Sequence, residues 1–359
     1  MSLSCDLFCR VVDNFGDAAV CWRLAKQLVG EHGWQVRLWI DDIVPLSMLR
    51  PGFDPRQPSQ TIDGVEVLRW PTPFPDVPPR QVAIEAFACE LPERFVNAMA
   101  AQPKQPVWLN LEYLSAEPWV VGCHGLPSPH PRLPLIKHFF FPGFVAGTGG
   151  LIRERDLVAP VLQPDDTALR ISLFCYENTA LPRLLDVWRD GERPIVCRVA
   201  DGAPRRQTEE WLGQTLAIGR AVSRGKLQLE ALPFLPQTDY DVLLRDCQVN
   251  FVRGEDSFVR AQWAERPFVW QAYPQEANAH IGKLTAFLNL YTAHLSSAAG
   301  EAVAAFGLAW NGQGDAGDTW HAFAAHLNDL QGHGSWWAKE IGHQGNLAEN
   351  LVSFCRDRI

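Results

Sequence analysis

The sequence predicts an α/β protein with two domains, each containing a largely parallel sheet covered by helices on both faces. The chain has 359 residues, more than one ordinary hydrophobic core accommodates. Short apolar runs typical of strands alternate with segments of helical periodicity in the first half, and the alternation begins again after residue 165. We therefore expect a first domain over residues 1–150 and a second over residues 165–344.

The first element pair is a strand, a turn and a helix. Residues 7–12 form a continuous apolar run that predicts a strand buried on both faces, and apolar residues recur at helical spacing from Val20 onward. The turn carries Asp13 and Asp17, and Gly16 allows it to bend sharply. Both carboxylates follow the end of a strand, where open α/β sheets bind their ligands. Asp17 is also a preferred N-cap, so a purely structural role stays open for it, whereas Asp13 precedes the cap.

Five further strand-like runs follow in the first half. Two proline-rich pieces, residues 71–79 and 127–131, are interpreted as loops, because strand-like runs continue beyond them. The domain boundary is placed near residues 143–164, where a glycine-rich segment precedes a charged one. The expected strands are residues 34–40, 65–70, 82–89, 107–111 and 136–141.

The second half contains another strand, polar turn and helix. The strand of residues 248–252 leads into a turn in which Asp256 or Ser257 can cap the next helix. Backbone N–H groups beside Arg253 would offer a phosphate site. Glu255 and Asp256 would repel phosphate unless they face sugar hydroxyls, so a capped surface turn stays an alternative. The other expected strands are residues 169–176, 194–199 and 227–232, and the expected helices are residues 179–188, 208–218, 239–247 and 258–264.

The C-terminal part is mostly helical. The final helix, residues 346–356, places Leu347, Leu351 and Phe354 on one face. We therefore expect residues 345–359 to cross back and complete the first domain. The preceding helices are expected at residues 278–291, 298–306 and 320–330.

Composition excludes several classes of protein. A net charge of −9 and an isoelectric point near 5.6 disfavour general nucleic-acid binding, which needs a basic face. No apolar run reaches the roughly 18 residues of a membrane span, and the start lacks the basic segment of a signal peptide, so we expect no membrane association and a cytoplasmic location. Nine cysteines, an odd number, favour reduced buried thiols over a disulfide framework.

Two apparent motifs lack the context that would give them meaning. Residues 312–317 match G-x-G-x-x-G, but Asp315 and Asp318 would face the pyrophosphate and the context is helical, so we interpret them as a surface loop. His321 and His326 are one residue further apart than an i, i+4 zinc pair and point to different faces. No third ligand is evident, and we expect no metal site.

Six motifs follow one another along nearly the whole chain. They are Asp13-Asn14-Phe15-Gly16-Asp17, Val20-Cys21-Trp22-Arg23-Leu24-Ala25, Asn110-Leu111-Glu112-Tyr113-Leu114-Ser115-Ala116-Glu117, Phe234-Leu235-Pro236-Gln237, Arg253-Gly254-Glu255-Asp256-Ser257 and Tyr273-Pro274-Gln275. Together they resemble the elongation factor P arginine rhamnosyltransferase family. The resemblance implies a GT-B type glycosyltransferase, with two Rossmann-like α/β domains facing each other across a cleft. It implies transfer of L-rhamnose from dTDP-β-L-rhamnose to an arginine of translation elongation factor P, with inversion at the anomeric carbon and activation of that factor.

The resemblance also implies a donor site in the second domain. Phe174 and Tyr176 would flank the thymine, and Gln237 and Tyr240 would lie beside the base and the deoxyribose. Phe174 and Tyr240 could equally be core residues, because aromatic residues at strand ends are usually packing residues.

The diphosphate end of the donor would meet the second polar turn. By the same resemblance, Arg253, Asp256 and Ser257 would hold the nucleotide diphosphate, and Glu255 would meet the donor near the reacting sugar. The leaving diphosphate gains negative charge in the transition state, which Arg253 and the helix N-terminus would stabilise without a metal cofactor.

The acceptor site is implied in the first domain. Asp13 and Asp17 match the acidic pair of the family, whereas Asn14, Phe15 and Gly16 between them are expected among the residues that bind the donor. Arginine is a poor nucleophile, because removing its proton near neutral pH costs roughly 7 kcal/mol, at about 1.36 kcal/mol per pH unit. We therefore predict that the two carboxylates bind the guanidinium and that Asp17 takes the proton as the new bond forms.

Two other functions stay in view. A GT-B glycosyltransferase acting on a carbohydrate or a lipid would share the cleft, but it would have less use for two carboxylates facing the acceptor. A non-catalytic nucleotide-sugar-binding protein would bind the donor without forming a product.

Overall fold

The computed structural model describes residues 2–13, 15–157 and 167–359. These residues form two compact units. Unit 1 comprises Met1–Leu157 together with Ile341–Ile359, and unit 2 comprises Val158–Glu340. The last segment of the chain therefore returns to the unit that contains the first.

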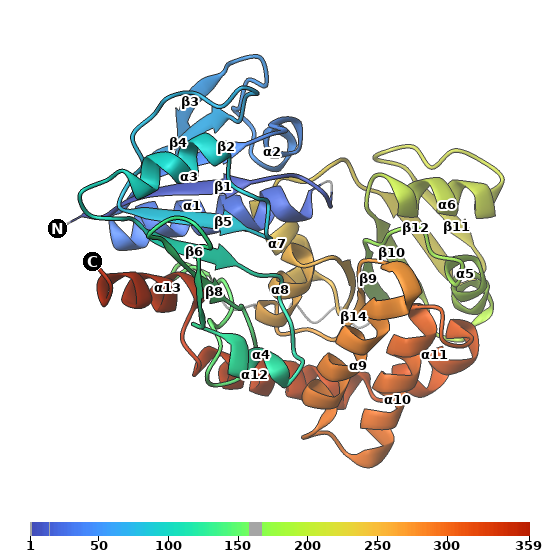
Figure 1. Ribbon diagram of the computed structural model, residues 1–359. Coiled ribbons are helices and arrows are strands. Elements are labelled where there is room, and N and C mark those ends of the chain that lie inside the picture. The colour runs from blue at the N-terminus through green and yellow to red at the C-terminus, as the bar shows by residue number, and fades with distance from the viewer. Residues whose placement is uncertain (1, 14, 158–166) are drawn as a thin grey trace. The chain divides into compact units, whose positions relative to one another are not determined.

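Unit 1 is built on an eight-stranded sheet of order β3-β4-β2-β1-β5-β6-β8-β7 (Figure 1). Six neighbouring strands, from β4 to β8, run parallel, and only the edge strands β3 and β7 are antiparallel. Parallel strands of this kind end at one common edge, which is where the first acidic turn lies. The strands are β1 (Ser4–Cys9), β2 (Gln35–Ile40), β3 (Ser59–Ile62), β4 (Val65–Arg69), β5 (Val82–Ala86), β6 (Val107–Leu111), β7 (Pro127–Pro129) and β8 (Ile136–Phe140).

Helices cover both faces of this sheet. On one face, Phe8 of β1 belongs to an aromatic cluster that includes Phe95 of α3. On the other face α1 packs against β1 and β2, and α13 packs on α1. The expected return of the C-terminal helix is confirmed, and the N–H of Leu347 donates to the Leu151 carbonyl at 2.9 Å. The helices of unit 1 are α1 (Gly16–His32), α2 (Val44–Leu49), α3 (Glu93–Ala100), α4 (Trp119–Cys123) and α13 (Leu347–Arg356).

Unit 2 is built on a six-stranded sheet of order β11-β12-β10-β9-β13-β14, in which only the pair β11 and β12 is antiparallel (Figure 1). Phe251 of β13 packs on Trp188 of α5 and Trp310 of α10, whereas Asn250 donates to the Leu244 carbonyl of α7. Adjacent residues of one strand therefore face different helix layers. The strands are β9 (Leu169–Leu173), β10 (Ile195–Val199), β11 (Ala221–Arg224), β12 (Leu227–Ala231), β13 (Val249–Arg253) and β14 (Phe268–Gln271).

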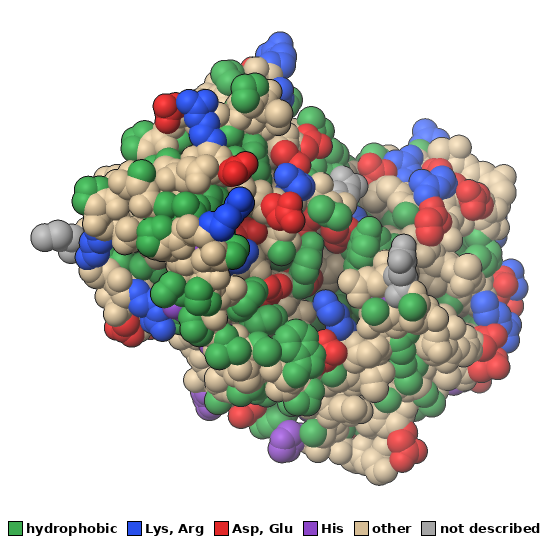
Figure 2. Space-filling view, viewed as in Figure 1, with side chains coloured by type: hydrophobic (Ala, Val, Ile, Leu, Met, Phe, Trp, Pro, Cys, Tyr) green, Lys and Arg blue, Asp and Glu red, His purple; other side chains and the backbone are tan. Residues whose placement is uncertain are grey.

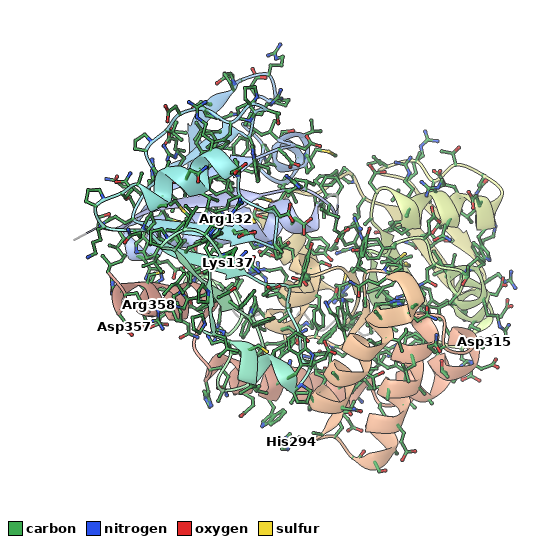
Figure 3. The ribbon with its side chains drawn as sticks, viewed as in Figure 1. Arg132, Lys137, His294, Asp315, Asp357 and Arg358 are labelled. Carbon is green, nitrogen blue, oxygen red and sulfur yellow. The ribbon has the colours of Figure 1, made fainter. Side chains whose placement is uncertain are left out.

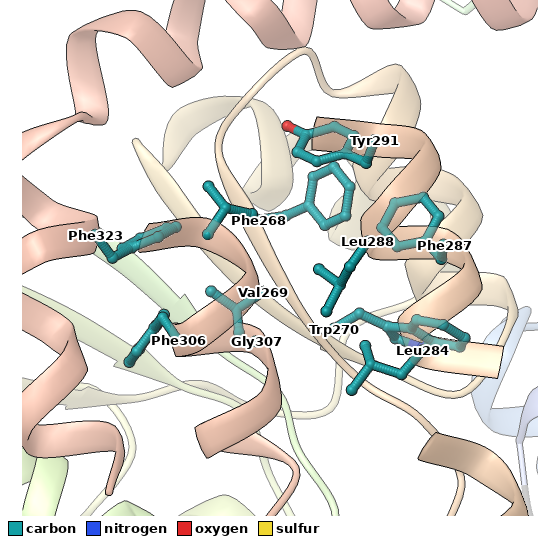
Figure 4. A pocket seen from close by; sticks show the side chains of 11 residues that line it. Phe268, Val269, Trp270, Leu284, Phe287, Leu288, Tyr291, Phe306, Gly307 and Phe323 are labelled. Atoms are coloured by element: carbon teal, nitrogen blue, oxygen red, sulfur yellow. The ribbon is translucent and has the colours of Figure 1, made fainter. Parts of the chain in front are cut away.

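The helices of unit 2 bury a second, strongly aromatic core. A small gap in this core lies between β14, α9 and α10, and apolar side chains such as Trp270, Phe287 and Leu288 line it (Figure 4). Such a lining offers no polar groups to orient a ligand, so the gap is a packing feature. The helices are α5 (Leu181–Asp190), α6 (Ala203–Leu212), α7 (Gln237–Asp246), α8 (Asp256–Trp263), the short η1 (Glu276–Asn278), α9 (Ala279–Thr292), α10 (Ser297–Trp310), α11 (Ala316–Ala325) and α12 (Leu327–Gly342), whose last two residues belong to unit 1.

Several predicted elements were wrong in extent. The first strand ends at Cys9, because the N–H groups of Val11 and Val12 bond to the carboxylates of Asp41 and Asp17 instead of to a neighbouring strand. Residues 127–131 are not simply a loop, since Pro127–Pro129 forms the edge strand β7, a position that tolerates proline. The helix expected at residues 208–218 begins and ends earlier, at Ala203–Leu212, where Gly213 adopts a left-handed conformation.

The expected helix of residues 320–330 is two helices. It breaks at His326, which is the C-cap of α11, and α12 begins at the next residue. The surface loop expected at residues 312–317 covers only residues 312–315, because Ala316 and Gly317 are buried in the first turn of α11. Asp315 caps this helix by accepting hydrogen bonds from the N–H groups of Gly317 and Asp318 (Figure 3).

The surface carries charges of both signs. Figure 2 shows Lys and Arg side chains interspersed with Asp and Glu side chains on the visible face. Within residues 2–13, 15–157 and 167–359, no helix is long and apolar enough to cross a bilayer. All nine cysteines are unpaired with one another in the structure, and all but Cys123 are buried.

Candidate functional site

The carboxylate of Asp17 closes the turn that follows β1. Asp17 is the second residue of α1, and its side chain is only 2% exposed. Its Oδ2 accepts hydrogen bonds from the N–H groups of Val12 and Asp13, both at 2.8 Å. The N-cap of α1 is Phe15, which makes no side-chain cap bond. The capping interpretation of Asp17 is therefore wrong: its carboxylate holds the preceding turn rather than the first turn of the helix.

Burial makes Asp17 a better proton acceptor than an ordinary carboxylate. Removal of the carboxylate from water raises the pKa of Asp17, and the nearby charge of Asp41 acts in the same direction. Hydrogen bonds from the backbone of Asp13 and Val12 and from the Tyr113 side chain act in the opposite direction on this pKa. The net shift is upward, toward the range in which a carboxylate can serve as a general base near neutral pH.

The other residues of the turn surround this carboxylate. Asp13 is half-buried, and its carbonyl accepts the N–H of Gly16 at 2.6 Å. A Cβ on Gly16 would lie 2.7 Å from Oδ2 of Asp13, so the absence of a side chain makes room for that carboxylate. Gly16 does not have the positive φ that its predicted role in bending the turn would require. Phe15 is half-buried beside them, and Asn14 lies outside the described residues.

Two aromatic residues that sequence reasoning missed lie beside the turn. Tyr113 follows β6 and its ring stacks on Phe87, which follows β5, with centroids 4.5 Å apart and an interplanar angle of 18°. Phe87 has a φ of 57°, a conformation that bulky residues rarely adopt. Tyr113 belongs to the motif at residues 110–117, but the residue pattern of that motif does not predict a contact with Asp17.

Arg253 is the centre of the candidate site of unit 2. It is the last residue of β13, and its guanidinium carbon lies 4.5 Å from the ring centre of Phe174 and 4.3 Å from that of Tyr176. Both aromatic residues follow β9, the strand that pairs with β13. The structure therefore brings these three predicted residues together at the carboxyl end of the sheet.

Ser257 fixes the backbone of Arg253. Its hydroxyl accepts the Arg253 N–H at 3.0 Å and donates to the Arg253 carbonyl. The N-cap of α8 is Glu255, and it makes no side-chain cap bond. The prediction that Asp256 or Ser257 caps this helix is therefore wrong, and the helix begins at Asp256 without a side-chain cap.

Gln237 and Tyr240 lie on the first turn of α7. Gln237 is buried, and the ring of Tyr240 meets that of Phe174 edge to face at 5.7 Å. Burial raises the pKa of Tyr240 well above its ordinary value, so its hydroxyl stays protonated. Asp241 of the same helix forms a buried two-point ion pair with Arg260 of α8, at 2.9 and 2.8 Å. This pair ties the helix of Gln237 and Tyr240 to the helix of Ser257.

Metal ligands do not cluster in the described part of the chain. Among residues 2–13, 15–157 and 167–359, no three His, Cys, Asp or Glu side chains are placed to hold one ion. His321 lies on α11 and His326 is its C-cap.

Comparison with known proteins identifies the family. A sequence profile of the elongation-factor P (EF-P) rhamnosyltransferase EarP family matches residues 5–356. The chain belongs to this family. Protein-arginine rhamnosyltransferases from Pseudomonas putida and Pseudomonas aeruginosa are 46% and 44% identical to it, over 100% and 99% of both chains. A protein-arginine rhamnosyltransferase from Neisseria meningitidis is 35% identical, over 98% of this chain and 96% of its own. This EarP-family chain is therefore an enzyme, a glycosyltransferase of the protein-arginine rhamnosyltransferase type.

Solved structures agree with this assignment. A structure from work on EarP-mediated arginine glycosylation of translation elongation factor EF-P is 32% identical, with a TM-score of 0.68 and full coverage of both chains. MurG of Acinetobacter baumannii has a TM-score of 0.51 at 11% identity, covering 99% of this chain and all of its own, which shows a shared fold. The expected fold class is confirmed: the EarP-family enzyme has the two α/β units of GT-B glycosyltransferases.

The raised pKa of Asp17 predicts an unusual effect of Asp17→Asn on stability. Because the folded pKa lies above the unfolded value of about 3.9, the wild type loses stability as the pH rises from the unfolded pKa through the folded one. Asparagine does not titrate, and its side-chain carbonyl still accepts from the Val12 and Asp13 N–H groups. Urea unfolding between about pH 4 and pH 8 should therefore show the variant gaining on the wild type as pH rises.

Asp63→Asn is the matched control. The hydrogen bond from Arg50 lowers the pKa of Asp63, so its stabilising contribution is present above the unfolded pKa and is lost as the pH falls through the folded one. Asn also tolerates the left-handed conformation of Asp63. We expect Asp63→Asn to lose stability relative to wild type as the pH rises toward neutral. If Asp17→Asn did the same, the assignment of Asp17 as a carboxylate destabilised by burial would be contradicted.

Proposed function

We propose that this enzyme transfers L-rhamnose from dTDP-β-L-rhamnose to an arginine side chain of translation elongation factor P, with inversion at the anomeric carbon. The observation that carries the proposal is the buried, proton-accepting carboxylate of Asp17 beside Asp13 in a member of the EarP family. The related structure concerns arginine glycosylation of that same factor, which supports the choice of acceptor. The proposed location is the cytoplasm, where translation factors work.

Unit 1 is proposed to bind the acceptor. A guanidinium is planar and presents several N–H donors, so two neighbouring carboxylates can hold it and orient one nitrogen. Asp13 is half-buried at the turn and Asp17 is buried behind it, which places one carboxylate near the surface and one deeper. Asn14, Phe15 and Gly16 are proposed to contribute to binding of the donor.

Asp17 is proposed to be the general base. Free deprotonation of arginine is too costly near neutral pH, so the proton must leave as the nitrogen attacks the anomeric carbon. Burial raises the pKa of Asp17, which increases its affinity for the departing proton. The new bond joins the guanidinium nitrogen to the anomeric carbon, the bond to the diphosphate breaks, and the proton passes to Asp17.

Unit 2 is proposed to bind the donor. The thymine would lie against the aromatic pair of Phe174 and Tyr176, with Gln237 and Tyr240 beside the base and the deoxyribose. Arg253 already lies against both rings, so its guanidinium is within reach of a diphosphate attached to a nucleoside held there. Charge-assisted hydrogen bonds from Arg253 would offset the charge that the leaving diphosphate gains.

The turn after Arg253 would hold the rest of the donor. Asp256 and Ser257 begin α8, whose N-terminal end attracts negative charge. Glu255, at the N-cap, would meet the sugar hydroxyls near the reacting carbon. The proposed scheme uses these side chains and this helix end, and it needs no metal ion.

Intact-mass measurement of the acceptor tests the reaction. Unmodified elongation factor P is incubated with dTDP-β-L-rhamnose and either the wild type or Asp17→Asn. We expect one added deoxyhexose with the wild type, on a single arginine, and almost none with the variant, because no general base remains. A wild type that binds the donor but leaves the mass unchanged would refute the acceptor and favour a carbohydrate or lipid acceptor.

Titration with dTDP tests the donor site. Arg253→Ala should weaken binding about 10- to 100-fold, the effect of losing a charge-assisted hydrogen bond to phosphate. Arg183→Ala is the control, because Arg183 is half-exposed on α5 and pairs with Asp315 and Asp318. Unchanged affinity in Arg253→Ala, measured by calorimetry, would remove Arg253 from the donor site.

A further inference from the structure

An unusual backbone segment follows β5 at the carboxyl end of the unit 1 sheet. Phe87, Ala88 and Glu90 all have positive φ angles, of 57°, 52° and 56°. Residues other than glycine rarely adopt this conformation, and a bulky aromatic side chain adopts it least readily. Such strain persists only where the surroundings over-determine it, and it concentrates at functional sites.

Buried polar groups hold this segment in place. The N–H of Phe87 donates to the Leu111 carbonyl at 2.7 Å, and that of Ala88 donates to Oδ1 of Asn110 at 3.1 Å. The N–H of Glu90 donates to Oε1 of Glu85 at 3.0 Å. Each of these acceptors lies near the end of β5 or β6, so the sheet itself fixes the segment.

Glu85 is in turn fixed by two further contacts. Its side chain is only 2% exposed, and its Oε2 accepts from Nζ of Lys137 at 3.1 Å and from Nε1 of Trp108 at 3.2 Å. Lys137 lies on β8 (Figure 3). Three neighbouring strands therefore contribute to one network that keeps Phe87 in its strained conformation.

The strained conformation presents the ring of Phe87 to Tyr113. The two rings stack nearly parallel, with centroids 4.5 Å apart. Tyr113 follows β6, and its side chain makes a hydrogen bond to the carboxylate of Asp17. The contacts thus run from the Leu111 carbonyl through Phe87 and Tyr113 to the carboxylate that is proposed to accept the proton, and Glu85 holds Glu90 of the same segment.

We propose that Phe87 and Tyr113 form a positioning pair that holds the Asp17 carboxylate in the orientation required for proton removal from the acceptor guanidinium. The proposal rests on the role proposed above for Asp17. Tyr113 fixes the carboxylate through its hydrogen bond, in addition to the backbone N–H donors of the turn. Phe87 fixes the ring of Tyr113 by stacking on it. Neither residue needs to touch the substrate.

The charged and titratable groups around Asp17 come from five segments. They are Cys9 of β1, Cys21 of α1, Asp13 of the turn, Asp41 after β2 and Tyr113 after β6. Asp41 disfavours the ionised form of Asp17. Both thiols are protonated, because the hydrogen bond with Cys21 and burial raise the pKa of Cys9, and burial raises the pKa of Cys21. The Tyr113 hydroxyl is the side-chain donor in this set that favours the ionised carboxylate, so its loss should raise the pKa of Asp17.

Tyr113→Phe tests the proposal, because it removes the hydroxyl and keeps the ring. We expect kcat/KM for the acceptor to fall about tenfold or more, the effect of losing a hydrogen bond to a charged group. The acidic limb of its pH profile should move to higher pH, because the free enzyme must ionise Asp17 to act as a base. The affinity for dTDP should not change. Tyr291→Phe is the control, since that buried hydroxyl of unit 2 has no hydrogen-bond partner among the described residues.

A second readout does not depend on activity. In urea unfolding, the gain of Asp17→Asn on its Asp17 parent should continue to a higher pH, and become larger, in the Tyr113→Phe background than in the wild-type background, because only the folded-state pKa of Asp17 changes. Phe87→Leu keeps an apolar side chain but removes the stacking ring, and it should move the acidic limb in the same direction. If Tyr113 and Phe87 had a merely structural role, their substitution would lower stability. It would move neither the acidic limb of the pH profile nor the pH dependence of the Asp17→Asn stability gain.

The outcomes separate this proposal from the proposed function. If the wild type rhamnosylates the acceptor and Tyr113→Phe has a wild-type rate and an unmoved acidic limb, the positioning pair is refuted and the function stands. The wild type could instead form no product while the pH dependence of the Asp17→Asn gain still differs between the two Tyr113 backgrounds as expected. The contact between Tyr113 and Asp17 would then stand, and its catalytic purpose would be refuted.

Discussion

The hydrogen bonds between the Asp17 carboxylate and the N–H groups of Val12 and Asp13 are the constraint on which the first unit depends. They replace the pairing that a longer β1 would have made, and they end the strand at Cys9. Because Asp17 is the second residue of α1, they also tie the start of this helix to the turn that precedes it. A carboxylate buried for this purpose is costly, because the charge leaves water, and the raised pKa of Asp17 records that cost. The hydrogen bonds therefore shape the turn, and the burial that accompanies them raises the pKa of Asp17.

The second unit uses a similar device without a charge. Ser257 lies in the first turn of α8 and reaches back four residues to the N–H and carbonyl of Arg253, as Asp17 reaches back to Asp13. In both units a side chain of the helix fixes the backbone at the end of a parallel strand. The hydroxyl of Ser257 adds no negative charge beside Arg253, whereas the carboxylate of Asp17 adds one beside Asp13.

The sequence allowed the two α/β units, the return of the last helix and the position of both polar turns to be predicted. Hydrophobic periodicity is sufficient for this, because parallel strands buried on both faces leave continuous apolar runs. The edge strands β3 and β11 were missed, although Asp63 and Gly64 between β3 and β4 are a typical hairpin turn. The end of β1 was misplaced because Val11 and Val12 have side chains typical of strands. The N–H of Val11 instead donates to the carboxylate of Asp41, and the N–H of Val12 donates to that of Asp17.

The contacts of the site were harder to predict than its location. Asp17 was recognised, but local spacing left a capping role open, and only the folded turn shows from which N–H groups its carboxylate accepts hydrogen bonds. The left-handed conformation of Phe87 contradicts its local preference, so it depends on the surrounding structure. Its N–H donates to the Leu111 carbonyl, and Asn110 holds the N–H of the next residue, Ala88. Tyr113 reaches Asp17 from a segment about one hundred residues later, a pairing that needs the parallel order of β1, β5 and β6. Interactions of this range are invisible to motif spacing.

The most direct test of the account is a double-mutant cycle between enzyme and acceptor. Binding of elongation factor P, with its acceptor arginine intact or changed to glutamine, is measured by calorimetry against wild-type enzyme and Asp17→Asn. If the buried carboxylate holds the guanidinium, the two changes should be coupled by about 1.5 kcal/mol or more, as close charge pairs at interfaces are. Additive effects of the two changes would contradict the account, because the arginine would then bind without contacting Asp17.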